Sequence, residues 1–435
     1  MRVSYRVLQS GACLTLVLFI AACADTPPST IASVPTPMSN WASGVDTLPG
    51  TYTGLSSATE FSHGVIVTTD LIEKLVWRLD VDARARRVLS ARGGGPGEYD
   101  SPVFAVNIGH DSVALLGNQD PTFPVISVTT GRGRTHRLPH RFAPSRMVTG
   151  SLSAGEPTLQ YADTLGHIYG APTVTAPVAN PHSGRRDLST MRVLESIPVV
   201  RYSLVTGRVD TLEYVPRGVA ATPTTRDGNV RTRGMELGSY GAFNSWSVTS
   251  DGHLVIANAA QYTLKVSDAA GPDTLLAQWR ITGNVIPVSA SSWDAYIKKA
   301  TTGSTALIAR MNATLFSRIG KAPPIANPTR YIVPPKPRVL PYLSFADGKR
   351  RMHESEGVVW VPVHVTDPPG PQYWDIINLA TGQRLSTVAL PPNEYLMTVT
   401  ARGAYVMASD QDDQERLLLY RHPNASPTAY SRQRR

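Results

Sequence analysis

Residues 357–382, GVVWVPVHVTDPPGPQYWDIINLATG, contain the unit that decides the fold. A glycine opens a short apolar strand, a polar and proline-rich break follows, and a second apolar strand runs into a Thr-Gly pair. Glycine at such a pair supplies the positive φ that a tight reversal between antiparallel strands needs. The stretch therefore predicts a β-hairpin whose second strand turns back into a third.

Six copies of this hairpin occur along the 435 residues, and they open at Gly64, Asp111, Gly166, Gly252, Gly357 and Gly403; four of them run into a Thr-Gly or Ala-Gly turn. Successive copies start 47, 55, 86, 105 and 46 residues apart. The short gaps match one four-stranded propeller blade of about 40–50 residues, and the two long gaps must hold insertions. Six copies of one hairpin predict an all-β fold, a six-bladed β-propeller rather than a sandwich.

A propeller ring must be closed, because an open last blade exposes an unpaired strand edge. After residues 416–420 the chain offers no outer strand for its last blade. Near the N-terminus, Val45-Asp46-Thr47-Leu48 matches the outer-strand segments at 209–212 and 272–275. We therefore expect residues 45–49 to pair with the last blade and close the ring, within a propeller domain that spans 41–422.

The larger insertion covers about 284–336. Apolar residues from Trp293 and from Leu307 onward fall near helical spacing, which predicts two helices. Ser291 and Asp294 resemble a capping box at the start of the first helix. A proline-rich return follows that is unsuited to an internal strand. The insertion is either a lid or partner surface or a packed elaboration of the rim.

The N-terminal residues have the pattern of an export signal. Residues 1–22 combine two arginines with an apolar run too short for a permanent membrane span. The run ends in Ala21-Ala22-Cys23, which resembles a bacterial lipobox with Cys23 as the lipidated residue; an ordinary secretory signal with an incidental cysteine is the alternative. Cys13 and Cys23 are the two cysteines of the chain, so the body has no thiol chemistry.

Residues 23–40 contain this cysteine and a polar, proline-rich stretch that predicts a flexible tether. Residue 24 is Ala rather than Asp, and by resemblance to Gram-negative lipoprotein sorting this favours an outer-membrane lipoprotein that faces the periplasm or the cell surface. The formal charge of +9 falls to about +7 when Arg2 and Arg6 leave with the signal. Residues 423–435 form a basic tail, predicted to be disordered. We expect a monomer held to the membrane by its lipid anchor, with no nucleic-acid partner.

Between the first two copies lies Arg92-Gly-Gly-Gly95-Pro-Gly97-Glu98-Tyr99. This segment resembles the GPGE-aromatic motif of the six-bladed propeller lipoproteins of Bacteroidota and Gemmatimonadota, relatives of NHL-like and TolB-like propellers. The resemblance implies the fold and an envelope location and little about activity. The glycines permit close backbone approach and an anion-binding nest, and Glu98 adds a carboxylate. The alternative is that Glu98 caps backbone amides and Tyr99 packs between blades.

In a propeller, the loop after each opening strand and the connection between blades emerge on one face. This places Asp70, Asp120, Asn258 and Asp410 on the same face as the Glu98 segment. Oxygen atoms gathered there suit a polar ligand or a divalent cation such as Ca²⁺, although no cofactor is evident from a motif. Asp and Asn also bond their own backbone in turns, so a purely structural role is the alternative.

Motifs for chemistry are absent from the sequence: there is no G-x-S-x-G, H-E-x-x-H or phosphate-binding loop. No catalytic residue is assigned. We expect a binding or interaction module for an envelope protein or a small polar or glycan ligand, rather than an enzyme. The alternative is a metal-dependent lactonase, hydrolase or lyase that gathers Glu98, Asp70 and Asp120 around a cation at the channel mouth. Fold class does not choose between them.

Overall fold

The structure is a computed structural model. It describes residues 34–61, 64–91, 93, 98–99, 102–117, 122–137, 159–171, 196–216, 218–219, 224–225, 242–268, 274–299, 301–302, 331–333, 336–343, 351–367, 370–412 and 414–423. These residues belong to a compact unit that spans Ala32–Arg435.

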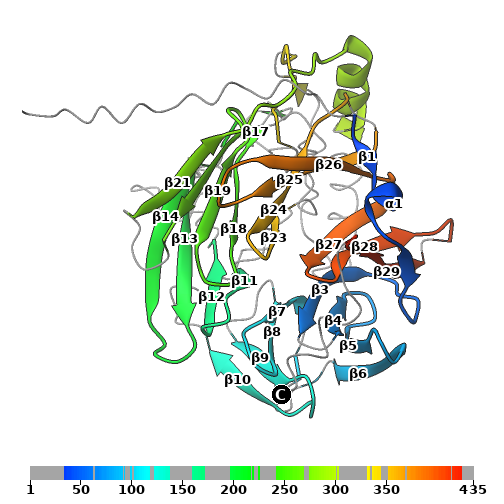
Figure 1. Cartoon of the computed structure of the whole chain (residues 1–435), viewed down its shortest axis with the longest axis vertical. Helices are drawn as coiled ribbons and strands as arrows, with labels where there is room; N and C mark the ends of the chain where they lie inside the picture. The colour runs from blue at the N-terminus through cyan, green and yellow to red at the C-terminus, as the bar shows by residue number, and fades with distance from the viewer. Residues whose placement is uncertain are drawn as a thin grey trace, which may run out of the picture. The chain divides into compact units, whose positions relative to one another are not determined.

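Six sheets, each with four antiparallel strands and one with a fifth strand added, form the six blades of a β-propeller, as the sequence predicted (Figure 1). The strands of blades 1 to 3 are β3 (Leu55–Phe61), β4 (Val65–Asp70), β5 (Leu75–Asp80), β6 (Ala85–Ala91), β7 (Pro102–Asn107), β8 (Ser112–Gly117), β9 (Thr122–Ser127), β10 (Gly133–Arg137), β11 (Leu159–Ala162), β12 (His167–Gly170), β13 (Ser196–Ser203) and β14 (Val209–Pro216). Those of blades 4 to 6 are β18 (Ser245–Val248), β19 (Leu254–Asn258), β20 (Thr263–Ser267), β21 (Leu275–Arg280), β23 (His353–Ser355), β24 (Val358–Val363), β25 (Gln372–Asn378), β26 (Arg384–Leu390), β27 (Glu394–Thr400), β28 (Gly403–Ser409) and β29 (Glu415–Arg421).

The ring closes as the sequence predicted. Blade 6 takes its outer strand from the N-terminal side of the chain, β2 (Val45–Thr47), which lies antiparallel to β29. Val45 is opposite Tyr420, and Thr47 is opposite Leu418. The last blade therefore has no open edge on this side.

Blade 5 carries a fifth strand that the sequence analysis assigned to the tether. β1 (Thr36–Pro37) pairs in parallel with β26, and α1 (Met38–Trp41) follows it. Met38 is buried in the cluster between blades 5 and 6, and the Trp41 ring meets Trp360 edge-on at 5.0 Å. The segment 36–41 thus belongs to the packed propeller and not to a flexible tether, because its apolar side chains contact the blade.

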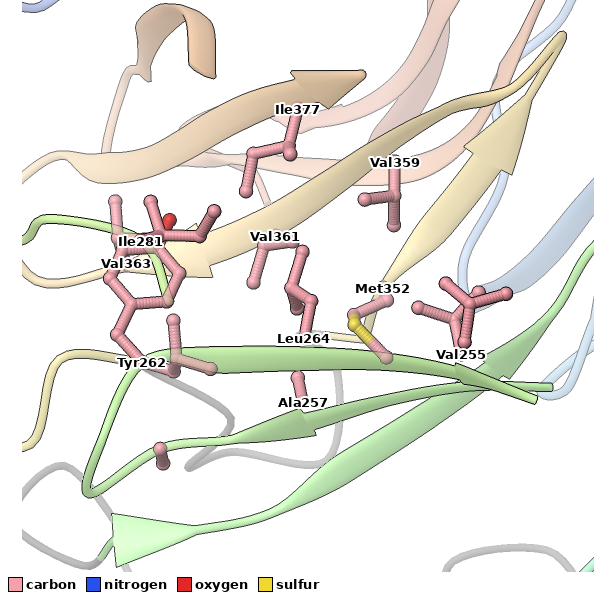
Figure 2. Close-up of a cluster of buried hydrophobic side chains, with 13 residues drawn as sticks. Val255, Ala257, Tyr262, Leu264, Ile281, Met352, Val359, Val361, Val363 and Ile377 are labelled. Atoms are coloured by element: carbon pink, nitrogen blue, oxygen red, sulfur yellow. The ribbon is translucent and has the colours of Figure 1, made fainter. Parts of the chain in front are cut away.

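Hydrophobic contacts between neighbouring blades supply the core. Figure 2 shows the cluster between blades 4 and 5, where Val255 and Leu264 of one blade lie against Val359, Val361 and Val363 of the next. Corresponding clusters occupy the other five junctions of the ring, including the one between blades 6 and 1. Each fully buried aliphatic side chain contributes about 1.5–3 kcal/mol, so each blade is stabilised chiefly by its two neighbours.

The insertion begins with a helix over residues 290–299, and the predicted second helix lies outside the described residues. The Ser289 hydroxyl accepts a hydrogen bond from the Ser292 amide at 3.1 Å, so Ser289 caps the helix and the expected cap at Ser291 is wrong. Asp367 of blade 5 accepts hydrogen bonds from the Ser289 amide and hydroxyl at 2.9 and 2.7 Å. The insertion is thereby fastened to the loop between β24 and β25.

Two short sheets connect further segments. β15 (Gly218–Val219) pairs with β17 (Ala242–Phe243), and β16 (Thr224–Thr225) pairs with β22 (Tyr331–Ile332). The second pair joins the insertion after blade 3 to the insertion after blade 4. In the part of the chain that the structure describes, no helix has the length and hydropathy needed to cross a membrane.

Candidate binding site on the upper face

We call the side of the ring that carries the turn between the second and third strands of each blade the upper face. Because strand direction alternates within a blade, the connection from each blade to the next emerges on the same side. Asp70, Asn258 and Asp410 all lie at these turns, at the ends of β4, β19 and β28. The structure therefore brings them to one face, as expected, but on separate blades.

Each of the three side chains bonds backbone amides of its own turn. Asp70 is fully buried, and its carboxylate accepts hydrogen bonds from the amides of Thr53, Ile72 and Glu73 at 2.9–3.0 Å. The Asn258 amide oxygen accepts from residues 260 and 261, and the Asp410 carboxylate accepts from residues 412 and 414. These contacts correspond to the alternative in which Asp and Asn stabilise turns.

Of the Arg92–Tyr99 segment, the structure describes Gly93, Glu98 and Tyr99; Arg92, Gly95, Gly97 and also Asp120 lie outside the described residues. Tyr99 is buried in the cluster between blades 1 and 2, and its hydroxyl donates to the carbonyls of Lys74 and Ser90 at 3.1 and 3.2 Å. Glu98 is exposed, and its carboxylate folds back onto Gly93, where a Cβ would collide with it. The Tyr99 side chain therefore joins two blades.

A pocket opens on the upper face between blades 4 and 5. Its polar lining comes from Tyr262, Asn284, His364, Asp375, Arg384 and Thr387. The cavity has a volume of about 20 Å³, which is space for one water molecule. A bound ligand would therefore place a single functional group in the cavity and lie over the upper face with the rest.

Asp375 forms the base of this pocket, and only 2% of its surface is exposed. Its Oδ1 accepts a hydrogen bond from the Thr387 hydroxyl at 2.5 Å, and its Oδ2 accepts from the Tyr262 hydroxyl and from Arg384 Nη1. Burial, and then the Asp375 charge, raise the pKa of Tyr262 well above its usual value, so this hydroxyl stays protonated and donates. A carboxylate has about four acceptor positions, so one more donor can reach Oδ1.

Sequence reasoning missed this pocket. Its one visible signal is Asp375, a charged residue in the middle of the apolar strand Tyr373–Ile377. Tyr262 belongs to another blade, 113 residues away, and only the ring places the two side chains together. Among the described residues, no three His, Cys, Asp or Glu side chains gather as a metal site requires.

No protein-family model matches the chain, and no curated protein matches it. Solved structures do match it. A candidate exported protein from Bacteroides fragilis is similar with a TM-score of 0.45 and 9% identity, covering 86% of this chain and 93% of that protein.

Two further matches have lower scores. The calcium-binding protein regucalcin from Agrobacterium tumefaciens has a TM-score of 0.39 and 10% identity, covering 91% of this chain and 98% of its own. A candidate gluconolactonase has a TM-score of 0.38 and 7% identity, covering 86% of this chain and 91% of its own. The six-bladed assignment rests on the strand order and ring closure of this chain itself.

Proposed function

We propose that this protein is an envelope-anchored binding module that holds a polar, hydroxyl-bearing ligand such as a glycan in the pocket between blades 4 and 5. The observation that carries the proposal is the buried Asp375 carboxylate, which lines a one-water cavity and accepts three side-chain hydrogen bonds where a carboxylate has about four acceptor positions. A ligand hydroxyl can replace that water and donate to Asp375. Arg384 Nη1 lies 3.3 Å from Asp375 Oδ2 and holds the carboxylate in place.

Binding is tested with an array of immobilised neutral oligosaccharides. Asn284 is exposed at the rim of the pocket, so an Asn284→Ala variant changes the ligand surface with little effect on the fold. Gln414 is exposed in the turn between β28 and β29 of blade 6, away from the pocket, and Gln414→Ala is the matched control. We expect Asn284→Ala to weaken glycan binding by roughly tenfold, the equivalent of about 1.4 kcal/mol, and Gln414→Ala to leave it unchanged. Equal binding by both variants would remove the pocket as the site.

The anchor is a separate part of the proposal: Cys23 carries the lipid, and the protein resides in the outer membrane. Its support is the sequence Ala21-Ala22-Cys23 after a short apolar run. Metabolic labelling with a radioactive fatty acid tests it, since Cys23→Ser should abolish the label while Cys13→Ser, in the apolar run, should retain it. Label that persists in Cys23→Ser would mean that another residue carries the lipid, and a wild type without label would be an unlipidated secreted protein.

A further inference from the structure

Arg351 projects from the start of blade 5 across the ring. It lies two residues before β23, the inner strand of that blade, yet its guanidinium carbon lies 4.8 Å from the centroid of the Phe104 ring. Phe104 belongs to β7, the inner strand of blade 2, on the other side of the ring centre (Figure 1). The Arg351 side chain therefore occupies the central channel near its upper end.

The surroundings of this cation are aromatic rather than acidic. Tyr161 of β11 lies near Arg351, and the Tyr161 ring meets Trp246 of β18 at 4.9 Å. Burial lowers the pKa of Arg351 from its usual value, which indicates that desolvation outweighs the favourable electrostatic contacts. Among the described residues, no carboxylate forms an ion pair with Arg351.

A second polar atom beside Arg351, the Nε2 of His353, has no hydrogen-bond partner among the described residues. His353 is 93% buried. Burial, and then the nearby Arg351 charge, hold the pKa of His353 well below its usual range, so the imidazole is neutral. An arginine with five N–H donors and an unpartnered imidazole nitrogen together leave hydrogen-bonding capacity unused inside the ring.

An isolated charge in such a setting costs several kcal/mol unless an opposite charge or water compensates it. Phe104 covers one face of the guanidinium through a cation–π contact, and this leaves the N–H edges open. Those edges match the geometry of a carboxylate or phosphate, which bind arginine with two parallel hydrogen bonds. Arg351 keeps partial exposure, so a small ion can reach it.

We propose that the central channel binds a small oxyanion, a phosphate, sulfate or carboxylate group, through the guanidinium of Arg351 above the Phe104 ring. This site is distinct from the pocket at Asp375, where the local charge is negative and already paired. It does not depend on the proposed glycan function.

The test compares thermal unfolding of the folded body in chloride, inorganic phosphate, sulfate and glucuronate at equal ionic strength. We expect phosphate or sulfate to raise the Tm of the wild type. If the channel binds a carboxylate instead, glucuronate alone should raise it. Arg351→Met should lose that rise and have a higher Tm than the wild type in chloride, because an uncompensated charge is removed. Arg338→Met, at an exposed arginine, is the control and should behave as the wild type.

Isothermal titration with inorganic phosphate gives a second measurement, and Arg351→Lys should bind roughly tenfold more weakly because an ammonium lacks the bidentate edge. Arg351→Lys also keeps the test valid if Arg351→Met does not fold. If both variants keep the rise in Tm on addition of the oxyanion, the oxyanion binds at another site. Two results would show that Arg351 has a purely structural role. In the first, no oxyanion raises the Tm of the wild type; in the second, Arg351→Met lowers the Tm by the same amount in every buffer.

Discussion

The Arg402 guanidinium donates two hydrogen bonds to the Asp82 carboxylate, from Nη1 to Oδ1 at 2.9 Å and from Nη2 to Oδ2 at 3.0 Å. Arg402 lies in the turn between β27 and β28 of blade 6, and Asp82 lies in the turn between β5 and β6 of blade 1. The Nε of the same arginine is 3.0 Å from Glu60 Oε1 on the inner strand of blade 1. One side chain thus fastens the last blade to the first, in addition to the closing strand β2.

Removal of this arginine should destabilise the ring more than removal of its exposed partner. The Arg402 side chain is 10% exposed, and at pH 8, above the raised pKa of Glu60, Arg402→Ala leaves the Glu60 carboxyl buried without a cation, at a cost of roughly 3 kcal/mol. The Asp82 side chain is 63% exposed, so Asp82→Asn should cost at most about 1 kcal/mol. Urea unfolding followed by tryptophan fluorescence measures both. Arg134→Ala, at an exposed arginine of blade 2, is the control, and a cost for Arg402→Ala no larger than for Arg134→Ala would contradict the clamp.

Glu60 should make the stability fall as the pH rises toward neutrality. Burial raises its pKa to about 7, although Thr400 and Arg402 act in the opposite direction. Because the folded carboxyl holds its proton more tightly than the unfolded one, its contribution is complete below about pH 4.5 and is lost as the pH rises through 7. The loss amounts to about 3 kcal/mol, from a shift of about 2.5 pKa units.

Unfolding free energies between pH 4.5 and 8 check this effect. We expect Glu60→Gln to remove most of the pH-dependent loss, since the amide does not ionise. Glu73→Gln, at an exposed glutamate of blade 1, should keep the wild-type slope. If the unfolding free energies of Glu60→Gln and the wild type depend on pH in the same way, Glu60 has the same pKa in the folded and the unfolded protein.

A variant of Asp70 distinguishes two roles for this residue, capping of a turn and binding of a cation. Its carboxylate accepts hydrogen bonds from three backbone amides, so Asp70→Ala should cost roughly 2–3 kcal/mol through amides left unpaired. We expect neither Ca²⁺ nor EDTA to change the Tm of the wild type through this residue. Elemental analysis with a thermal titration is the measurement, and a Ca²⁺-dependent rise in Tm that Asp70→Asn abolishes would restore the cation hypothesis.

The ring could be predicted from the sequence because each blade has its own local sequence pattern. Short apolar strands recur in all six copies, a glycine opens five of them and a Thr-Gly turn follows three, and the closing strand carries the same Val-Asp-Thr-Leu sequence as an outer strand. These signals involve only neighbouring residues. The segment 36–41 escaped prediction because Pro37 and the neighbouring Pro35 are typical of a tether, whereas the pairing of the segment with β26 is a long-range contact.

The candidate sites could not be predicted for a physical reason. Asp70 and Asn258 cap turns with the same oxygen atoms that a ligand would use, and the sequence does not separate the two roles. Lys349, Arg350 and Arg351 are consecutive basic residues, and nothing local indicates which of them reaches Phe104. Asp375 meets Tyr262 only after the ring has brought blades 4 and 5 together.

The turn glycines offer a matched pair that measures packing between blades. Gly207 and Gly382 follow threonine in equivalent turns of blades 3 and 5, with φ of +67° and +68°. A Cβ at Gly207 meets nothing within 4 Å, whereas a Cβ at Gly382 would collide with the Trp279 ring of blade 4. Gly207→Ala should therefore cost about 1 kcal/mol for the left-handed backbone alone.

Gly382→Ala carries the same backbone cost together with overpacking. Trp279 is partly buried and packs against the cluster between blades 4 and 5, so the collision should add roughly 2 kcal/mol. Chemical denaturation of the two variants gives the difference directly. A Gly382→Ala,Trp279→Leu double variant should recover part of the loss, because the shorter side chain leaves space for the new methyl group. If Gly207→Ala and Gly382→Ala lower the free energy of unfolding equally, the contact between Gly382 and Trp279 accommodates a methyl group without loss. The blades would then be held together by contacts nearer the axis of the ring.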